Sequence, residues 1–138
     1  MKTLYTTTAI ATGDGRNGHV QTTDGLLATD VRMPAALGGP GGATNPEQLF
    51  AAGYAACFHS ALKRVAGADG VDATDSEVVA DVSLGAHENG AFGLSVALEV
   101  TIPGADRETA EKVVARAHEV CPYSNATRGN IEVVLSIA

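Results

Sequence analysis

The stretch 49–62 constrains the fold of this chain most, because it reads as a helix that is apolar on nearly every side. Gly53 and several alanines within it permit a close approach of neighbouring elements. A helix of this kind has to be buried on most of its sides. For a chain of only 138 residues, a partner subunit satisfies that requirement more easily than the chain can alone.

The limits of this helix are marked at both ends. Its start has three signals: a capping Asn45, a Pro46 suited to the first turn, and a Gln48 that completes a capping-box pattern. We expect the helix to run to about Ala66, where Gly67 and Gly70 end it.

Three strand-like runs precede the helix, at about 3–12, 19–23 and 26–33. The segments between them, 13–18 and Asp24-Gly25, are turn sequences, since Gly, Asn and Asp tolerate positive φ. The runs therefore predict an antiparallel meander. The Gly-rich segment 34–45 reads as a loop.

Two alternating strands, about 77–84 and 92–102, follow the helix and are joined by the hairpin signal Asn89-Gly90. The run 106–120 predicts an amphipathic helix, and 131–137 predicts a last strand. The order is βββ-α-ββ-α-β, in which helices do not alternate with single strands. This favours an α+β fold, and we expect a single domain over 1–138.

The net charge of the chain limits the classes of partner that it can bind. Nine basic and sixteen acidic residues give a net charge of −7, which repels nucleic acid and anionic membrane surfaces. The first residues lack the apolar core of a signal peptide, and the uncharged stretch 48–62 is too short to span a bilayer. We therefore expect a cytoplasmic protein that binds neither nucleic acid nor membrane. Because that compartment disfavours structural disulfides, its two cysteines are core residues or working thiols.

The two cysteines differ in their surroundings. Cys57 lies mid-helix among apolar residues, where burial raises a thiol pKa and makes the thiol inert unless a cation is supplied. A core cysteine is the ordinary reading of such a position. Cys121 directly precedes Pro122, where a new helical turn can begin, and helix N-termini activate thiols. The residues alone therefore favour Cys121 as the more reactive of the two.

Two charged residues have both an ordinary and a functional reading. Arg16 lies in the Gly-rich first turn, where arginines are usually solvated, but its charged fork can also stabilise a thiolate and hold a substrate oxygen. Glu47 lies in the first turn of the helix, where it complements the helix dipole. It can also orient the Arg16 guanidinium through a bidentate pair. The residues alone leave both questions open.

Metal and hydrolase sites find little support. Zinc would need Cys57, His59, His118 and Cys121, but His59 faces away from Cys57 on a helix, and the spacings are unlike those of structural zinc sites. There is no nucleophile elbow and no phosphate-binding glycine motif. We expect no metal and no bound cofactor.

Two long motifs carry a resemblance to a known family. Residues 45–58 (NPEQLFAAGYAACF) and 120–131 (VCPYSNATRGNI) resemble the two cysteine motifs of the Ohr/OsmC family. Their wording, together with residues 11–18 (ATGDGRNG), is similar to the organic hydroperoxide resistance branch rather than to the osmotically induced branch. The resemblance covers essentially the whole chain.

The resemblance implies an OsmC-like fold, an intertwined homodimer with antiparallel sheets around long central helices, and active sites at the subunit interface. By similarity, Cys57 is the peroxidatic thiol, Cys121 the resolving thiol, Arg16 the cation that stabilises the thiolate, and Glu47 the residue that orients Arg16. This reverses the preference for Cys121.

The implied activity is the reduction of alkyl and lipid hydroperoxides to alcohols, through a Cys57 sulfenic acid and a Cys57–Cys121 disulfide, in protection against oxidative stress. The reductant is implied to be an external dithiol such as a dihydrolipoyl group. Two alternatives stay open: an OsmC-type peroxidase with broader peroxide use, and a redox sensor that does not turn over.

Overall fold

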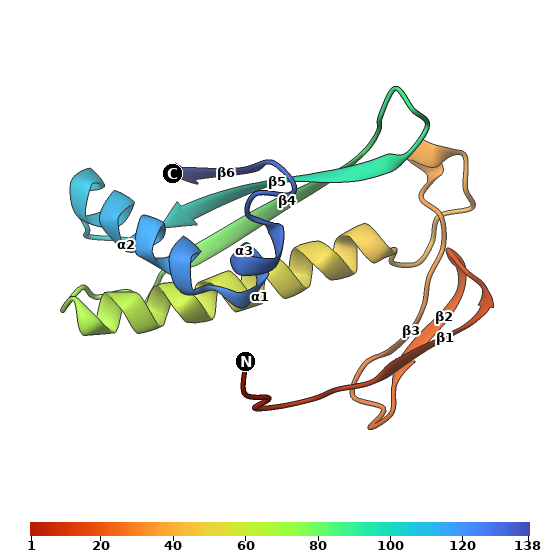
Figure 1. The fold of residues 1–138 in the computed structure, drawn as a ribbon, viewed down its shortest axis with the longest axis horizontal. Helices are drawn as coiled ribbons and strands as arrows, with labels where there is room; N and C mark the ends of the chain where they lie inside the picture. Colours follow the sequence, from red (N-terminus) through yellow and green to blue (C-terminus); the bar gives the residue numbers. More distant parts are fainter. The chain divides into compact units, whose positions relative to one another are not determined.

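The computed structural model describes residues 1–138, which form two compact units, Met1–Leu49 and Phe50–Ala138. Figure 1 labels the elements of both. The single domain expected over 1–138 stays a prediction. No helix has the length and apolar character needed to cross a membrane.

The first unit contains the antiparallel meander that the turn sequences predicted. Its strands are β1 (Ala9–Asp14), β2 (Asn17–Thr22) and β3 (Ala28–Asp30), in the order β1-β2-β3. The first strand begins at Ala9 rather than near residue 3, because its pairing partner β2 ends opposite Ala9, at Thr22. Backbone groups need such a partner to form a strand. The Gly-rich loop holds a short 3-10 helix, η1 (Ala35–Leu37), which we did not predict.

The long helix α1 (Pro46–Ala68) starts as predicted and ends slightly later. The Asn45 side chain accepts the N–H of Gln48 at 2.9 Å, so Asn45 is the cap. The Gln48 side chain accepts the hydroxyl of Thr44 instead of completing a capping box. At the other end Gly67 lies inside the helix, and Gly70, with a φ of 69°, provides the left-handed turn that ends it.

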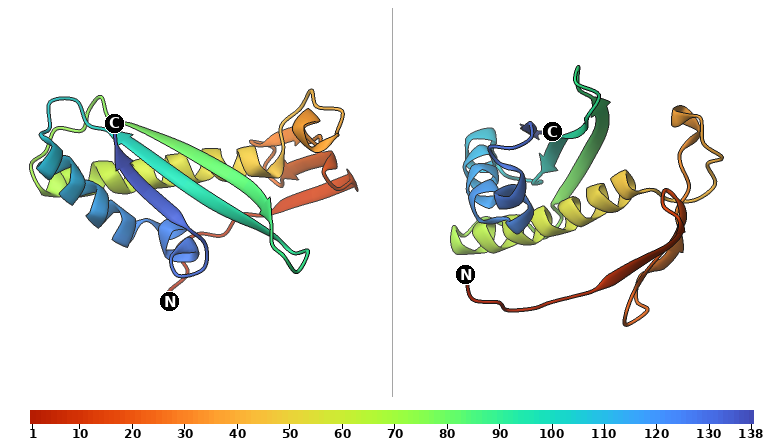
Figure 2. Two further views of the ribbon diagram at one scale, coloured as in Figure 1. Left: turned by 90° about the horizontal axis from the view of Figure 1, so that it is seen from above. Right: turned by 45° about the vertical axis from the view of Figure 1, so that its right-hand side comes forward.

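The second unit is a three-stranded sheet covered by helices on one face. Strands β4 (Glu77–Ala86) and β5 (Phe92–Thr101) form the predicted antiparallel hairpin, and β6 (Val133–Ile137) pairs with β5. Helices α1 and α2 (Arg107–Val120) lie against the same face of this sheet (Figure 2). A short helix, α3 (Pro122–Thr127), follows α2, where the sequence suggested only a new helical turn.

The pairing of β6 with β5 is parallel, which corrects the expectation of purely antiparallel sheets. The reason is the connection: α2 and α3 carry the chain from the end of β5 back to its start, so the next strand runs in the same direction.

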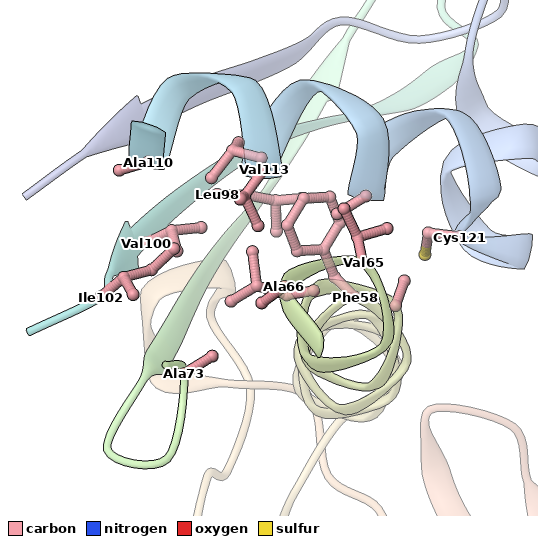
Figure 3. Packing of buried hydrophobic residues seen from close by; sticks show 14 of the residues in the cluster. Phe58, Val65, Ala66, Ala73, Leu98, Val100, Ile102, Ala110, Val113 and Cys121 are labelled. Carbon is pink, nitrogen blue, oxygen red and sulfur yellow. The ribbon is translucent and has the colours of Figure 1, made fainter. Parts of the chain in front are cut away.

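The core of the second unit lies between the sheet and the two helices (Figure 3). The predicted stripe of α2 is buried throughout: Ala110, Val113, Val114 and Ala117. On β5, Val96, Leu98 and Val100 face this core, while Phe92, which lies an even number of residues from them and so points to the same side of the strand, is 76% exposed beside the β4–β5 turn. Cys121 is a fully buried member of the cluster.

Helix α1 is only partly covered within the single chain. Tyr54, Phe58 and Leu62 are fully buried, whereas Ala52, Ala56 and Ser60 are exposed. These three exposed residues recur every fourth position and so form one stripe along the helix. The burial on most sides that the sequence predicts is thus not reached by one chain, and the partner subunit stays a prediction.

Candidate active site

The two cysteines, distant in sequence, lie in contact within the second unit. The thiol of Cys121 points at Cys57 with the two Sγ atoms 3.7 Å apart, and both cysteines are free. A disulfide bond needs an S–S distance of about 2.05 Å. The gap is small enough that side-chain rotation can close most of it.

Cys121 is placed by the junction of two helices. It ends α2, where its N–H donates to the Ala117 carbonyl at 2.9 Å, and it is also the N-terminal cap residue of α3. Pro122 produces this break, since it lacks an N–H and fits the first position of a new helix. The break turns the Cys121 side chain inward, where it is fully buried.

Burial raises the pKa of the half-buried Cys57 thiol, and the neighbouring Cys121 raises it further. The backbone N–H of Tyr123, in the first turn of α3, acts in the opposite direction and lowers the Cys57 pKa. The sequence suggested that the start of a helix would activate Cys121, but the backbone of Tyr123 in that helix lowers the pKa of Cys57 instead. This contact alone does not offset burial, so ionisation of Cys57 needs a further positive group.

Arg16 and Glu47, both in the first unit, form a two-pronged ion pair. Nη1 and Nη2 of Arg16 donate to the two carboxylate oxygens of Glu47 at 2.8 and 2.7 Å. The guanidinium hydrogen bond holds the pKa of Glu47 below its usual value, and the carboxylate raises the pKa of Arg16. The arginine is therefore permanently charged, and the fork geometry fixes its plane.

The turn that carries Arg16 depends on glycine. Gly15 has a φ of 56°, and the N–H of Gly18 donates to its carbonyl at 3.2 Å. A Cβ at Gly18 would lie only 2.2 Å from the Thr12 carbonyl oxygen across the hairpin. No side chain fits there, so the turn can close tightly under the arginine.

The histidines do not gather around the cysteines. Nε2 of His59 bonds to the Ser76 hydroxyl at 2.9 Å, away from Cys57 as expected for its position on the helix. The structure holds no group of three or more His, Cys, Asp and Glu side chains that could bind a metal ion.

Three residues near the cysteines were missed by the reasoning from sequence. The hydroxyl of Tyr54 lies within hydrogen-bond distance of the hydroxyls of Ser124 and Thr127, at 2.9 and 3.0 Å. No local pattern could have indicated these contacts, because they join residues 70 or more positions apart. The spacing alone held a hint: Tyr54 and Ser124 each lie three positions from a cysteine.

Comparison with known proteins identifies the family of the chain. Residues 39–136 match the family model described as OsmC-like protein. The organic hydroperoxide resistance protein of Xanthomonas axonopodis pv. citri is 50% identical over 99% of this chain and 96% of its own length.

Solved structures point to the same family. An organic hydroperoxide resistance protein from Legionella pneumophila superposes with a TM-score of 0.94 at 58% identity, with 99% of each chain covered. The organic hydroperoxide resistance protein OhrB of Bacillus subtilis superposes with a TM-score of 0.89 at 48% identity, covering 99% of this chain and all of that one. The chain therefore belongs to the OsmC-like family, and within it to the organic hydroperoxide resistance branch.

Proposed function

We propose that this protein is a thiol peroxidase that reduces organic hydroperoxides to alcohols, with Cys57 as the peroxidatic and Cys121 as the resolving thiol. The observation that carries the proposal is the 3.7 Å contact between the two sulfurs. The names of the relatives, which refer to organic hydroperoxide resistance, support the choice of substrate.

In the first step the Cys57 thiolate attacks one peroxide oxygen. An S–O bond forms, the O–O bond breaks, and the sulfur supplies the two electrons that reduce the peroxide. The leaving alkoxide takes a proton and departs as the alcohol. Cys57 is left as a sulfenic acid.

In the second step Cys121 attacks the sulfenic sulfur. The S–S bond forms, the S–O bond breaks, and the hydroxide leaves as water with the proton of the Cys121 thiol. An external dithiol, such as a dihydrolipoyl group, then exchanges with the disulfide and restores both thiols.

Arg16 supplies the positive charge that Cys57 lacks within its own unit. A cation close to a thiolate in a poorly solvated site lowers the pKa of the thiol. Glu47 holds the guanidinium in one orientation, which the two short hydrogen bonds between these side chains support.

A second copy of the chain completes the proposed molecule as a homodimer. The exposed stripe of α1, which carries Ala52 and Ala56, supports this. So does β1, all of whose residues are exposed in the single chain.

The preference for organic substrates follows from the aromatic rings on the Cys57 face of α1. Phe50 and Tyr54 precede Cys57 by two turns and one turn, and Tyr123 lies against both, with ring centroids about 6 Å apart. An alkyl or aryl group gains from contact with the two of these rings that are not fully buried, Phe50 and Tyr123, and hydrogen peroxide has no such group.

Steady-state kinetics tests the proposed activity. With a dithiol reductant in excess, cumene hydroperoxide should be consumed over many turnovers and faster than hydrogen peroxide. A single reaction followed by a halt would indicate a redox sensor. Faster consumption of hydrogen peroxide would indicate the broader peroxide use of an OsmC-type enzyme.

Replacement of the resolving thiol separates the two steps. We expect Cys121→Ser to react once with cumene hydroperoxide at close to the wild-type rate, and then to progress to sulfinic acid in excess peroxide, since no second thiol can capture the sulfenic acid. Intact-protein mass spectrometry over time measures the rate of the first oxidation and the later formation of sulfinic acid. A stable sulfenic acid on Cys121 in the wild-type protein would reverse the two roles.

A further inference from the structure

A buried chain of hydroxyl groups ties α3 to α1 beside the cysteine pair. Tyr54 and Ser124 are completely buried and Thr127 is 5% exposed. The Thr127 hydroxyl donates to the Tyr123 carbonyl at 3.0 Å, so it accepts from Tyr54 at 3.0 Å. The Tyr54 oxygen in turn accepts from Ser124 at 2.9 Å. Every hydroxyl hydrogen in this chain then has an acceptor.

The hydrogen bonds of this network hold α3 in place, and α3 is a helix that is not stable without contacts to other elements. The helix has only six residues, which is too short to be stable by itself. Cys121, its cap residue, forms no side-chain capping bond. The position of α3 is therefore set by the elements that it touches rather than by its own hydrogen bonds.

The spacing of the network matches that of the cysteines. Tyr54 lies one turn before Cys57 on the rigid helix α1, and Ser124 lies three residues after Cys121. The contact from Tyr54 to Ser124 thus runs beside the contact from Cys57 to Cys121.

A second contact supports the same turn of α3. The Tyr123 ring lies against α1 where Gly53 has no side chain, and a Cβ there would come within 2.8 Å of the Tyr123 hydroxyl oxygen. Both contacts hold the first turn of α3 on the face of α1 that carries Cys57.

We propose that Tyr54 is a positioning residue for the disulfide step: its hydroxyl holds the first turn of α3 against α1, so that Cys121 reaches an oxidised Cys57 before a second hydroperoxide does. The inference rests on the proposed peroxidase function for its kinetic consequence. The closeness of the two thiols that it explains can be measured without any peroxide.

The thiol–disulfide equilibrium of Tyr54→Phe in dithiothreitol buffers is the direct test. The variant keeps the ring and loses only the hydroxyl. We expect its disulfide to be about tenfold easier to reduce, the factor that one neutral hydrogen bond provides, or about 30 mV for this two-electron couple. Tyr5→Phe, which alters a tyrosine that is 78% exposed, is the matched control and should leave the equilibrium unchanged.

Ser124→Ala removes the same hydrogen bond from the other side and decides the question if Tyr54→Phe does not fold. The double variant should shift the equilibrium no more than the larger of the two single shifts, because both residues act through one contact. Fully additive shifts, or a shift below about twofold in both single variants, would overturn the proposal.

In excess hydroperoxide, closure of the disulfide competes with over-oxidation of Cys57. This competition measures the kinetic consequence of the role proposed for Tyr54. With Tyr54→Phe, half of the Cys57 should reach sulfinic acid at about a tenfold lower peroxide concentration than in the wild type, since disulfide closure is slower by that factor. Unchanged over-oxidation would contradict the proposal. A different result is that the wild-type protein fails to react with hydroperoxides while the variants still show the expected shift in the thiol–disulfide equilibrium. That result would contradict the proposed function, but the role of Tyr54 in placing α3 would stand.

Discussion

Cys57→Ser will reduce the consumption of organic hydroperoxides to the uncatalysed background. A serine hydroxyl stays protonated at neutral pH, so it does not attack the peroxide. Serine also has no sulfur that could be oxidised to a sulfenic acid. The measurement is steady-state consumption of cumene hydroperoxide with a dithiol reductant, beside the melting temperature of the variant.

The control for Cys57→Ser is Cys121→Ser, which removes the other thiol of the pair and should retain one rapid oxidation per chain. Serine is close in size to cysteine, so both variants should stay folded. Turnover by Cys57→Ser above the background would show that Cys121, or a group outside the pair, is the first thiol to react.

Arg16→Ala will slow the reaction of the enzyme with hydroperoxide by about tenfold near neutral pH, because a smaller fraction of the Cys57 thiol is ionised. Loss of a nearby cation raises the pKa of the Cys57 thiol, and the thiolate fraction near neutral pH falls as a result. A more basic thiolate is also a better nucleophile, with a Brønsted slope of about 0.5, so its greater nucleophilicity recovers about half of that loss on a logarithmic scale. Loss of the contact between the guanidinium and a substrate oxygen adds to the remaining deficit.

The dependence on pH distinguishes this effect from damage to the fold. The pKa of Cys57 is higher without Arg16, so the rate of the variant should continue to rise at pH values where the wild-type rate is already level. The gap between the two should therefore narrow as the pH increases. Rapid-mixing kinetics across pH, with the thiolate absorbance titrated in parallel, measures both quantities.

Two further variants refine the Arg16 test. Arg107→Ala removes an exposed arginine that pairs with Glu111 on α2 and should leave the rate unchanged. Glu47→Gln keeps the shape of the partner but weakens its hold on the guanidinium, so it should fall between the wild type and Arg16→Ala. An Arg16→Ala rate equal to the wild-type rate at neutral pH would return Arg16 to the role of a solvated turn residue.

Local signals predicted the elements of the fold well. The cap at Asn45 and the stripe of α2 lie where the sequence places them, because capping and amphipathic patterns act over a few residues. The misplaced boundaries depend on partners. The first strand begins at Ala9 because β2 ends opposite it, and α1 passes through Gly67 before it ends.

The site was predictable in its parts but not in its geometry. The apolar residues around Cys57 in the sequence indicate a buried thiol that needs a nearby cation to ionise. In the structure, burial raises the pKa of Cys57 as expected. The start of a helix predicted activation of Cys121, but it could not show that the backbone of Tyr123 lowers the pKa of Cys57, which lies on another helix. The Tyr54 network lay beyond local patterns for the same reason, since only the folded chain brings α3 onto α1.

The most direct test of the account is peptide mapping of the wild-type protein after one equivalent of cumene hydroperoxide, without reductant. We predict a single new species, in which Cys57 and Cys121 of the same chain are joined by a disulfide and both free thiols are lost together. Two thiols that stay free, or an oxidised Cys121 beside a reduced Cys57, would contradict the central claim that the two sulfurs in contact form one redox pair initiated at Cys57.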